Sequence, residues 1–416
     1  MGTCDIHVLI AGGGLSGLCL AQRLTRAGVR CSLFETATAP TACDYRLQID
    51  RHGGEALAQS LPEPLYRLYQ LLSHRTPRRR HAVILDPGGH ELGARKSPDA
   101  DDTSTLAHTA IHHRQLAQLL STGLDGVVHF GRGLTRCHEM HDHVVVELSD
   151  GSRVRGDLLV GADGLHSAVR RELLPHANPV DTGARTIYAR TPLTPDLLRG
   201  VPDIVAESGA AISEPGRAFF HLGCYRPRRT VAQAIAESGA ASLHPHIDPV
   251  ADYMMIGAQI GGLGSRPRPD EALFNADGPA LKAILCEHLS EKWHPGLRRL
   301  VEHVDPASCS VTALQTMQPP PEWPARRLTL IGDAVHATLP TLNAGANLAL
   351  SDAQVLAGKL TEAADGKLSL IEAVAAYEAD MRRYVTPILR TALRPPLSIR
   401  LLEAGLRWTR RWQFSR

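Results

Sequence analysis

The 416-residue sequence lacks the features that mark several common classes of protein. Its charge is nearly balanced, with 45 Lys and Arg against 43 Asp and Glu, so no overall basic field would attract nucleic acid. No stretch approaches the roughly 18 to 20 uninterrupted apolar residues of an integral membrane helix. The eight cysteines form no C-x-x-C pair, which argues against a disulfide framework and a zinc site. We therefore expect no metal, and a small molecule as the partner.

The N-terminal sequence has no basic region ahead of its first apolar run, and no small-residue cleavage site follows. We therefore expect a cytoplasmic protein without a signal peptide. The length suits two packed or interleaved domains that share a large core. The sequence leaves the choice between monomer and dimer open.

The chain opens with a strand, a glycine turn, a helix and a second strand, which is a βαβ order. Apolar residues 6–11 form the first predicted strand, residues 15–27 the helix and residues 30–35 the second strand. The turn between the first strand and the helix reads Gly12-Gly13-Gly14-Leu15-Ser16-Gly17.

This turn contains the G-x-G-x-x-G spacing of dinucleotide-binding proteins. Gly12 allows the tight bend, Gly14 lets backbone amides approach a pyrophosphate, and Gly17 lets helix and strand pack closely. The N-terminus of the helix then holds the phosphate charge. Glu35 follows about 20 residues later, where an acid hydrogen-bonds the adenosine ribose. The pattern predicts a dinucleotide site, whereas the glycines alone would also fit an ordinary turn.

A second motif lies far along the chain. The apolar strand at residues 328–331 ends in Gly332-Asp333, and a loop through Pro340 leads to a helix. A carboxylate at this corner can accept hydrogen bonds from a polyol such as ribitol. The helix start comprises Gly345, Ala346 and Asn347. Its amide groups and positive dipole end would point at the negative charge of a reduced flavin. A buried helix cap is the alternative reading of this segment.

With a third motif, Asp163-Gly164, the sequence resembles the group A flavoprotein monooxygenases, the superfamily of para-hydroxybenzoate hydroxylase and tetracycline-modifying monooxygenases. In that family the D-G motif is associated with FAD and the nicotinamide donor. The resemblance implies an α/β fold, with a Rossmann-like FAD-binding domain interleaved with a mainly β substrate domain and followed by a C-terminal helical segment. It also implies that FAD is contacted by Gly12, Gly14, Leu15, Ser16, Gly17, Glu35, Asp163, Gly164, Gly332, Asp333, Pro340, Gly345, Ala346 and Asn347.

Two arginines extend the resemblance. Arg114 matches an arginine that opens a helix and contacts FAD in the family. Arg46 lies where relatives bring side chains towards the flavin ring. One departure is visible, because relatives often read G-Q-G-x-N after the proline, whereas Asn343 stands here in place of the first glycine. This substitution puts the conformation of the loop in doubt.

The FAD-binding domain is predicted to comprise residues 1–73, 105–178 and 318–394, and the substrate domain residues 74–104 and 179–317. A basic amphipathic helix is predicted over residues 395–416, which can lie on a membrane surface or dock over the first domain. The arginine run at residues 78–80 can meet an anionic substrate or a nicotinamide phosphate, or be an exposed charged segment.

The resemblance implies a monooxygenase that uses FAD, NAD(P)H and O2. It would hydroxylate or epoxidise a small, largely apolar aromatic or polyketide-like substrate through a flavin C4a-hydroperoxide. No second glycine-rich βαβ unit is present, which fits a transiently bound NAD(P)H co-substrate. His221 and Arg46 are the candidate catalytic groups, and further pocket candidates, for which core packing is the alternative, are Phe219, Phe220, Tyr225, Met254 and Met255. A flavin dehydrogenase or reductase without oxygen activation, and a non-catalytic flavin-binding protein, are the competing readings.

Overall fold

The computed structural model describes residues 5–40, 44–74, 81–96, 109–207, 209–214, 216–261 and 270–393. The arginine run at residues 78–80 and the predicted helix over residues 395–416 lie outside them. Two hydrophobic cores organise the chain, one around a parallel sheet and the other around a large, mostly antiparallel sheet. The predicted α/β architecture with a second, mainly β part is thereby confirmed.

The first sheet is parallel and five-stranded, and its central strands are almost entirely buried because both faces are covered. Its strand order is β17-β11-β1-β2-β7, with β1 at the centre. The predicted βαβ start is confirmed, since the second strand covers the predicted residues and the first strand and helix match within one residue. The strands are β1 (His7–Ala11), β2 (Arg30–Glu35), β7 (Val128–Phe130), β11 (Leu158–Gly161) and β17 (Leu328–Leu330).

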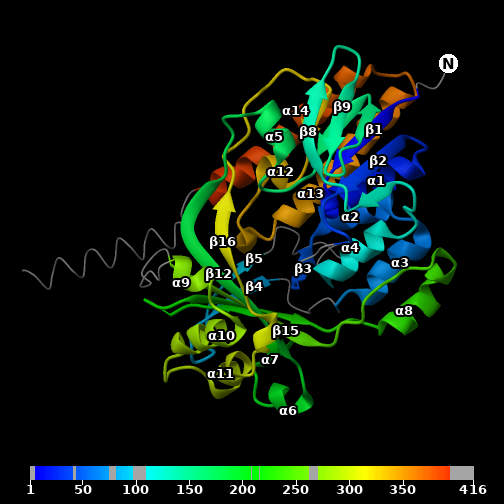
Figure 1. Ribbon diagram of the computed structural model, residues 1–416. Helices are drawn as coiled ribbons and strands as arrows, with labels where there is room; N and C mark the ends of the chain where they lie inside the picture. The colour runs from blue at the N-terminus through cyan, green and yellow to red at the C-terminus, as the bar shows by residue number, and fades with distance from the viewer. Residues whose placement is uncertain are drawn as a thin grey trace, which may run out of the picture.

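Long helices cover one face of this sheet (Figure 1). The core between them is built from leucine, valine and alanine side chains at helical spacing. The helix α14 begins with a capping box, in which Ser369 and Glu372 exchange hydrogen bonds with each other's backbone N–H groups. The main helices are α1 (Leu15–Arg26), α13 (Gly345–Ala364) and α14 (Leu370–Ala392), and the short ones α5 (Ala168–Leu173) and α12 (Asp333–His336).

Smaller elements extend the first part. A three-stranded antiparallel sheet has the order β10-β9-β8, and β3 pairs with β6 in a two-stranded ladder. These strands are β3 (Arg46–Ile49), β6 (Thr109–His112), β8 (Leu134–Glu139), β9 (Val144–Leu148) and β10 (Arg153–Gly156). The accompanying helices are α2 (Arg51–Ser60), α3 (Glu63–Leu72) and α4 (His113–Ser121).

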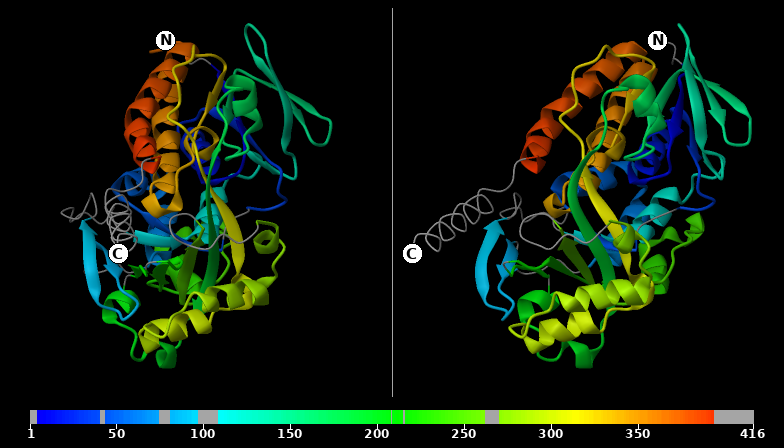
Figure 2. Two further views of the ribbon diagram at one scale, coloured as in Figure 1. Left: turned by 90° about the vertical axis from the view of Figure 1, so that its left-hand side faces the viewer. Right: turned by 60° about the vertical axis from the view of Figure 1, so that its left-hand side comes forward.

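The second sheet has seven strands in the order β16-β12-β15-β14-β13-β4-β5. It lies at the other end of the molecule from α13 and α14 (Figure 2). The hairpin β4–β5 adds two strands to its edge. The strands are β4 (His81–Leu85), β5 (Glu91–Lys96), β12 (Val180–Pro192), β13 (Ala210–Ile212), β14 (Phe219–Tyr225), β15 (Tyr253–Ile260) and β16 (Ser310–Thr316).

Helices cover one face of the second sheet and form the second core with it. They are α6 (Pro195–Leu198), α7 (Asp203–Glu207), α9 (Asp270–Phe274), α10 (Gly278–Glu287) and α11 (Pro295–Glu302). The helix α8 (Val231–Ser238) instead packs against α3 of the first part, and its residue Ala234 belongs to the first core. The domain limits drawn from the sequence stay a prediction.

Candidate active site

The glycine turn between β1 and α1 has the geometry of a phosphate-binding loop. Gly12 has a φ of +107°, and a Cβ atom there would lie 2.4 Å from the carbonyl oxygen of Ala162. A Cβ atom at Gly17 would lie 2.1 Å from the carbonyl oxygen of Gly12. Gly14 caps α1 without any side-chain hydrogen bond, so the N–H groups of the first helical turn are available to an anion. Leu15 and Ser16 belong to that turn.

Glu35 lies directly beside the glycine turn. Its Oε2 accepts a hydrogen bond from the backbone N–H of Gly13 at 2.5 Å, and its Oε1 accepts one from Ala37 at 2.8 Å. These contacts fix the carboxylate at the end of β2, while each oxygen keeps further lone pairs for a hydroxyl group. This is the position expected for an acid that binds an adenosine ribose.

The Gly332–Asp333 corner reaches the same region from the end of β17. Gly332 has a φ of +61°, and a Cβ atom there would lie 2.9 Å from the Oγ of Ser16 in α1. Solvent reaches Asp333, yet surrounding protein atoms raise the pKa of its carboxyl group by desolvation. Both observations fit a carboxylate in a recess. Two segments more than 300 residues apart therefore meet at this point.

Beneath this corner lies a buried polar network centred on Asp352 of α13. Its Oδ2 accepts hydrogen bonds from the backbone N–H of Gly332 at 2.7 Å and from Nε2 of His336 at 2.6 Å. The hydroxyl group of Tyr384 donates to its Oδ1. Burial lowers the pKa of His336, but the neighbouring Asp352 and Asp333 raise it above its usual value on balance. The network holds the corner in place.

In the loop that leads from Pro340 to α13, Asn343 stands where the family pattern has its first glycine. Asn343 has a φ of +52°, the left-handed region in which Asn is tolerated better than most other residues. The helix α13 then begins at Gly345, with no side-chain hydrogen bond to its first turn. A Cβ atom at Gly345 would lie 3.9 Å from Oδ1 of Asp333, so the helix start and the carboxylate are neighbours. Ala346 belongs to this first turn.

The side chain of Asn347 is engaged with the protein backbone. Its amide group donates to the carbonyl oxygens of Gln48 and Asn343, and its Oδ1 accepts from the N–H of Asp50. Asn347 therefore ties α13 to the segment between β3 and α2. In this arrangement, its side chain positions neighbouring backbone, and its contact with FAD stays a prediction.

The Asp163-Gly164 motif lies at the end of β11, next to the glycine turn. Oδ2 of Asp163 accepts a hydrogen bond from the N–H of Ala168 at 2.6 Å and caps α5, whereas its Oδ1 is buried without a partner among the described residues. Gly164 has a φ of +71°. Arg170 donates to the carbonyl oxygens of Leu165 and Ala334. It thus links the D-G loop to the residues after Asp333.

Arg46 joins the two parts of the molecule. It begins β3, and its guanidinium group donates to the carbonyl oxygen of Cys224 in β14 and to Oε1 of Gln48, both at 2.9 Å. Burial lowers the pKa of Arg46. Gly223 gives it room, since a Cβ atom there would lie 3.1 Å from the arginine side chain.

Arg114 is held by an acidic residue that the sequence did not single out. Its guanidinium group lies 2.6 Å from Asp44, which also binds Arg190 of β12 at 2.8 Å. Asp44 therefore links α4 of the first part to the second sheet. No local sequence signal marks this residue, because both of its partners are distant in the chain.

One face of the seven-stranded sheet lies towards Tyr45 and Arg46 of the first part. Along β14, Phe219, His221 and Tyr225 lie on this face, and the register adds Met255 of β15 and Tyr188 of β12. Tyr188 stacks on Tyr45 with ring centroids 5.3 Å apart, next to β3. Of the pocket candidates, Phe220 and Met254 point the other way and pack in the second core.

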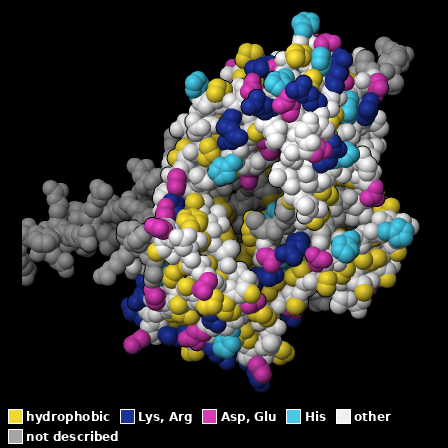
Figure 3. All heavy atoms as spheres, in the orientation of Figure 1, with side chains coloured by type: hydrophobic (Ala, Val, Ile, Leu, Met, Phe, Trp, Pro, Cys, Tyr) yellow, Lys and Arg dark blue, Asp and Glu magenta, His cyan; other side chains and the backbone are white. Residues whose placement is uncertain are grey.

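His221 is the polar group of interest on this face. Its Nε2 is buried without a hydrogen-bond partner among the described residues, and Phe219 contacts its ring edge-on with centroids 4.7 Å apart. Burial lowers the pKa of His221 to about 4. Its imidazole group is therefore neutral at physiological pH. Figure 3 shows the molecular surface hollowed between the two parts.

The residues at this junction fit an FAD. The uncapped start of α1, with Gly12 and Gly17 in close approach, suits a pyrophosphate. The solvent-exposed carboxylate of Asp333 suits the hydroxyl groups of the ribitol. The start of α13, which has no side-chain cap, suits the negative edge of a flavin. The buried, unpartnered Oδ1 of Asp163 is a further acceptor beside the turn.

Two family models match the chain. Residues 10–58 match an NAD(P)-binding Rossmann-like domain, and residues 303–392 match an FAD binding domain. These segments contain the glycine turn with Glu35 and the Gly332–Asp333 corner with α13 and α14. The two matched segments therefore cover both halves of the candidate cofactor site.

Several characterised proteins are similar over most of this chain. The 3-amino-4-hydroxybenzoate 2-monooxygenase of Streptomyces cremeus is 30% identical over 364 residues, 86% of this chain and 79% of that protein. A dual O-methyltransferase/FAD-dependent monooxygenase of Cercospora beticola is 30% identical over 390 residues, 90% of this chain but 44% of that protein. The chain thus spans less than half the length of the two-function fungal relatives that it matches. It belongs to the family of FAD-dependent monooxygenases.

Solved structures share the fold. HpxO of Klebsiella pneumoniae, solved with FAD and uric acid, has a TM-score of 0.72 at 21% identity, covering 94% of this chain and 87% of that one. The tetracycline destructase Tet(55) has a TM-score of 0.63 at 18% identity, covering 94% and 88%. Across the described part of the chain, no helix combines the length and apolar character needed to cross a membrane.

Proposed function

We propose that this protein is an FAD-dependent monooxygenase that uses NAD(P)H and O2 to hydroxylate or epoxidise a small, largely apolar substrate. The observation that carries the proposal is the meeting of the glycine turn and the Gly332–Asp333 corner below the sheet face that bears His221. In this proposal, the cofactor site and the apolar face of the second sheet lie next to each other. When bound, FAD supplies the redox chemistry, accepting electrons from NAD(P)H and reacting with O2 at C4a.

The chain's own residues would bind and orient the cofactor. In this proposal, the first turn of α1 and Gly14 hold the pyrophosphate, and Glu35 accepts from the adenosine ribose. Asp333 accepts from ribitol hydroxyl groups. The start of α13 stabilises negative charge at the flavin edge because its N–H groups and positive dipole end point outward.

Arg46 and Arg114 are proposed to complete the cofactor site from β3 and α4. The guanidinium group of Arg46 contacts Cys224 in the second sheet, and that of Arg114 contacts Asp44. They would therefore couple the position of the cofactor to that of the sheet. Asp163 and Gly164 are proposed to border the cofactor from β11.

The substrate is proposed to be aromatic or polyketide-like. Aromatic side chains and Met255 line the face of the second sheet, which favours a planar apolar molecule. Because His221 is neutral, it can exchange one hydrogen bond with a hydroxyl or carbonyl group but contributes no charge. The named substrates of the relatives, an aminohydroxybenzoate among them, are of this chemical kind.

Oxygen uptake tests the proposal. With bound FAD and a panel of aromatic compounds, a true substrate should accelerate NAD(P)H oxidation and O2 consumption together, and product mass should rise by one oxygen atom. NAD(P)H oxidation without matching O2 uptake would indicate a dehydrogenase or reductase instead. Bound FAD that neither NADH nor NADPH reduces would indicate a non-catalytic flavin-binding protein.

A further inference from the structure

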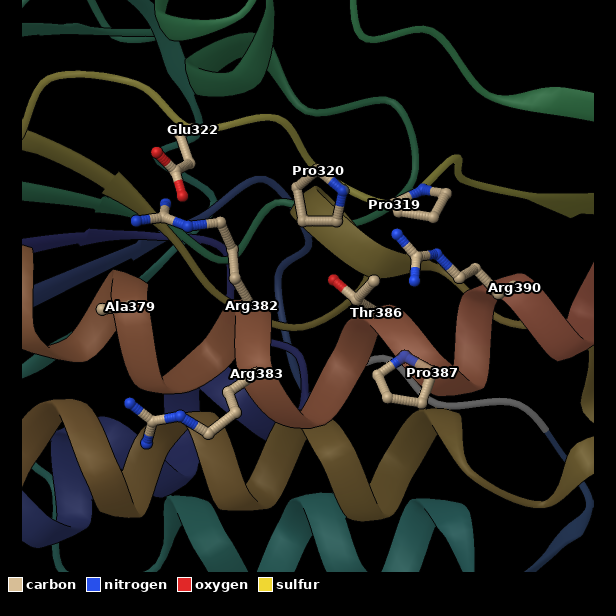
Figure 4. Close-up of a pocket in the computed structure, with 9 residues that line it drawn as sticks. All are labelled: Pro319, Pro320, Glu322, Ala379, Arg382, Arg383, Thr386, Pro387 and Arg390. Atoms are coloured by element: carbon tan, nitrogen blue, oxygen red, sulfur yellow. The ribbon is translucent and has the colours of Figure 1, made fainter.

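A groove of about 650 Å3 lies between α14 and the segment that follows β16 (Figure 4). This volume lies within the range of small-molecule sites. Pro319, Pro320 and Glu322 form the wall contributed by that segment. The other wall is α14, which contributes Ala379, Arg382, Arg383, Thr386, Pro387 and Arg390. None of these residues has a role in the proposed cofactor site.

Three polar residues of α14 share one face of the helix. Arg382, Thr386 and Arg390 are spaced four residues apart, so successive side chains lie one turn above another. Figure 4 shows all three directed at the proline segment, whereas Arg383 points the opposite way. The hydroxyl group of Thr386 therefore lies between two guanidinium groups.

Neither of these two arginines forms an ion pair with a described residue, although the charge of Arg382 acts on Glu378 of the same helix. Nη1 of Arg382 is buried without a hydrogen bond, and its guanidinium group lies 5.0 Å from the ring centre of Trp323. Arg390 is exposed and forms no ion pair with any described residue. Arg383, by contrast, is paired with Asp380 at 2.9 Å. An anion in the groove would supply the missing acceptors.

We propose that this groove binds the diphosphate group of a nucleotide. Two guanidinium groups flanking one hydroxyl group offer several donors to the oxygens of two linked phosphates, and arginine binds phosphate oxygens in a bidentate manner. The prolines offer an apolar surface to the attached nucleoside. The carbonyl end of α14 and the Glu322 carboxylate oppose an anion, so the affinity must come from the arginines.

The position of the groove relates it to the cofactor site. The helices α13 and α14 run antiparallel, and Tyr384 bonds Asp352 across them. Because the helices are antiparallel, Arg390, six residues after Tyr384, lies level with Ala346, six residues before Asp352 at the start of α13, where the flavin edge is proposed. The diphosphate can therefore belong to the nicotinamide dinucleotide, an assignment that rests on the proposed function, or to a free nucleoside diphosphate.

Calorimetric titration of the FAD-loaded protein with inorganic pyrophosphate and with ADP tests the proposal. We expect saturable binding that Arg390→Ala and Arg382→Ala each weaken about tenfold or more. Glu322→Gln should strengthen binding severalfold because it removes a repelling charge. Arg383→Ala is the matched control, and it should weaken binding far less than the other two arginine variants because its side chain points away from the proline segment (Figure 4). Absence of saturable binding, or an equal loss in Arg383→Ala, would overturn the proposal.

Steady-state kinetics separate the two sources of the diphosphate. A raised KM for NADH or NADPH in Arg390→Ala, with kcat unchanged, assigns the groove to the nicotinamide dinucleotide. An unchanged KM alongside weakened ADP binding assigns it to a free nucleotide. A wild-type enzyme that oxidises neither NADH nor NADPH contradicts the proposed function, yet the pyrophosphate titration still decides the groove.

Discussion

Nε2 of His336 lies 2.6 Å from Oδ2 of Asp352, and both side chains are fully shielded from solvent beneath Gly332. This contact joins the segment after the Gly-Asp corner to the helix that lies behind it. Because the same carboxylate oxygen accepts the N–H of Gly332, the pair fixes the direction in which Asp333 projects.

Removing either member of this pair should destabilise the protein strongly. His336→Ala or Asp352→Ala leaves a buried polar or charged group without its partner, which costs about 3 to 5 kcal/mol. Chemical denaturation of the purified variants measures the loss. The double variant should lose less than the sum of the two. Asp380→Ala, which breaks an exposed pair, is the control and should cost at most about 1 kcal/mol.

Glu378 should make stability fall as the pH rises. Burial raises the pKa of this carboxyl group from its usual 4.5 to about 7. Its protonated form is therefore favoured in the folded protein, and this contribution is complete below pH 4.5 and lost as the pH rises through 7. The difference is about 3 kcal/mol.

Glu378→Gln should consequently stabilise the protein at pH 8 and change little at pH 4.5. Denaturation curves at the two pH values measure this, and Thr329 can still donate to the amide oxygen. Glu372→Gln is a control of opposite sign, because a backbone hydrogen bond from Ser369 lowers the pKa of Glu372. Loss of the Glu372 carboxylate should weaken the helix cap at neutral pH. Equal pH dependence in wild type and Glu378→Gln would contradict the assignment.

Two glycines of the same turn should respond differently to alanine. A Cβ atom at Gly14 has no protein atom nearer than 4.0 Å, so Gly14→Ala should fold with unchanged stability but hinder the approach of a pyrophosphate. Gly12→Ala should lower the free energy of unfolding itself, because φ is +107° and Ala162 is too close. Thermal unfolding and FAD titration together distinguish the two effects. Full FAD affinity in Gly14→Ala would argue against phosphate binding at this turn.

His221 should act through a hydrogen bond rather than through charge. His221→Leu removes that bond but keeps a side chain of similar volume. We expect kcat/KM for the substrate to fall about tenfold. His221→Gln keeps a polar group and should lose less. Since burial lowers the pKa of His221 to about 4, its titration should not shape the pH profile between pH 6 and 8. Unchanged kinetics in His221→Leu would show that His221 only packs.

The sequence predicted best where short-range patterns decide the structure. The first βαβ unit, with Gly12, Gly14 and Glu35, follows from local glycine chemistry and strand periodicity. Phe219 and Phe220 were both pocket candidates, but the sequence alone could not say which of them lies on the sheet face towards the first part. The register with β12 and β15 decides that.

Contacts between distant residues could not be predicted. Asp44, Asp352 and Arg170 are ordinary polar residues in the sequence, and their partners come together only in the folded chain. The same limit applies to the side-chain contacts of Asn347 with the backbone of Gln48 and Asp50, while its predicted flavin contact stays a prediction.

The central claim is that the glycine turn and the Gly332–Asp333 corner jointly hold one FAD. The most direct measurement is the FAD content and affinity of wild type and Asp333→Ala, determined by flavin absorbance and titration at equal fold stability. We predict one FAD per wild-type chain and a loss of most of the affinity in Asp333→Ala. A wild-type protein that stays colourless with excess FAD, or full retention of flavin by Asp333→Ala, would contradict the account.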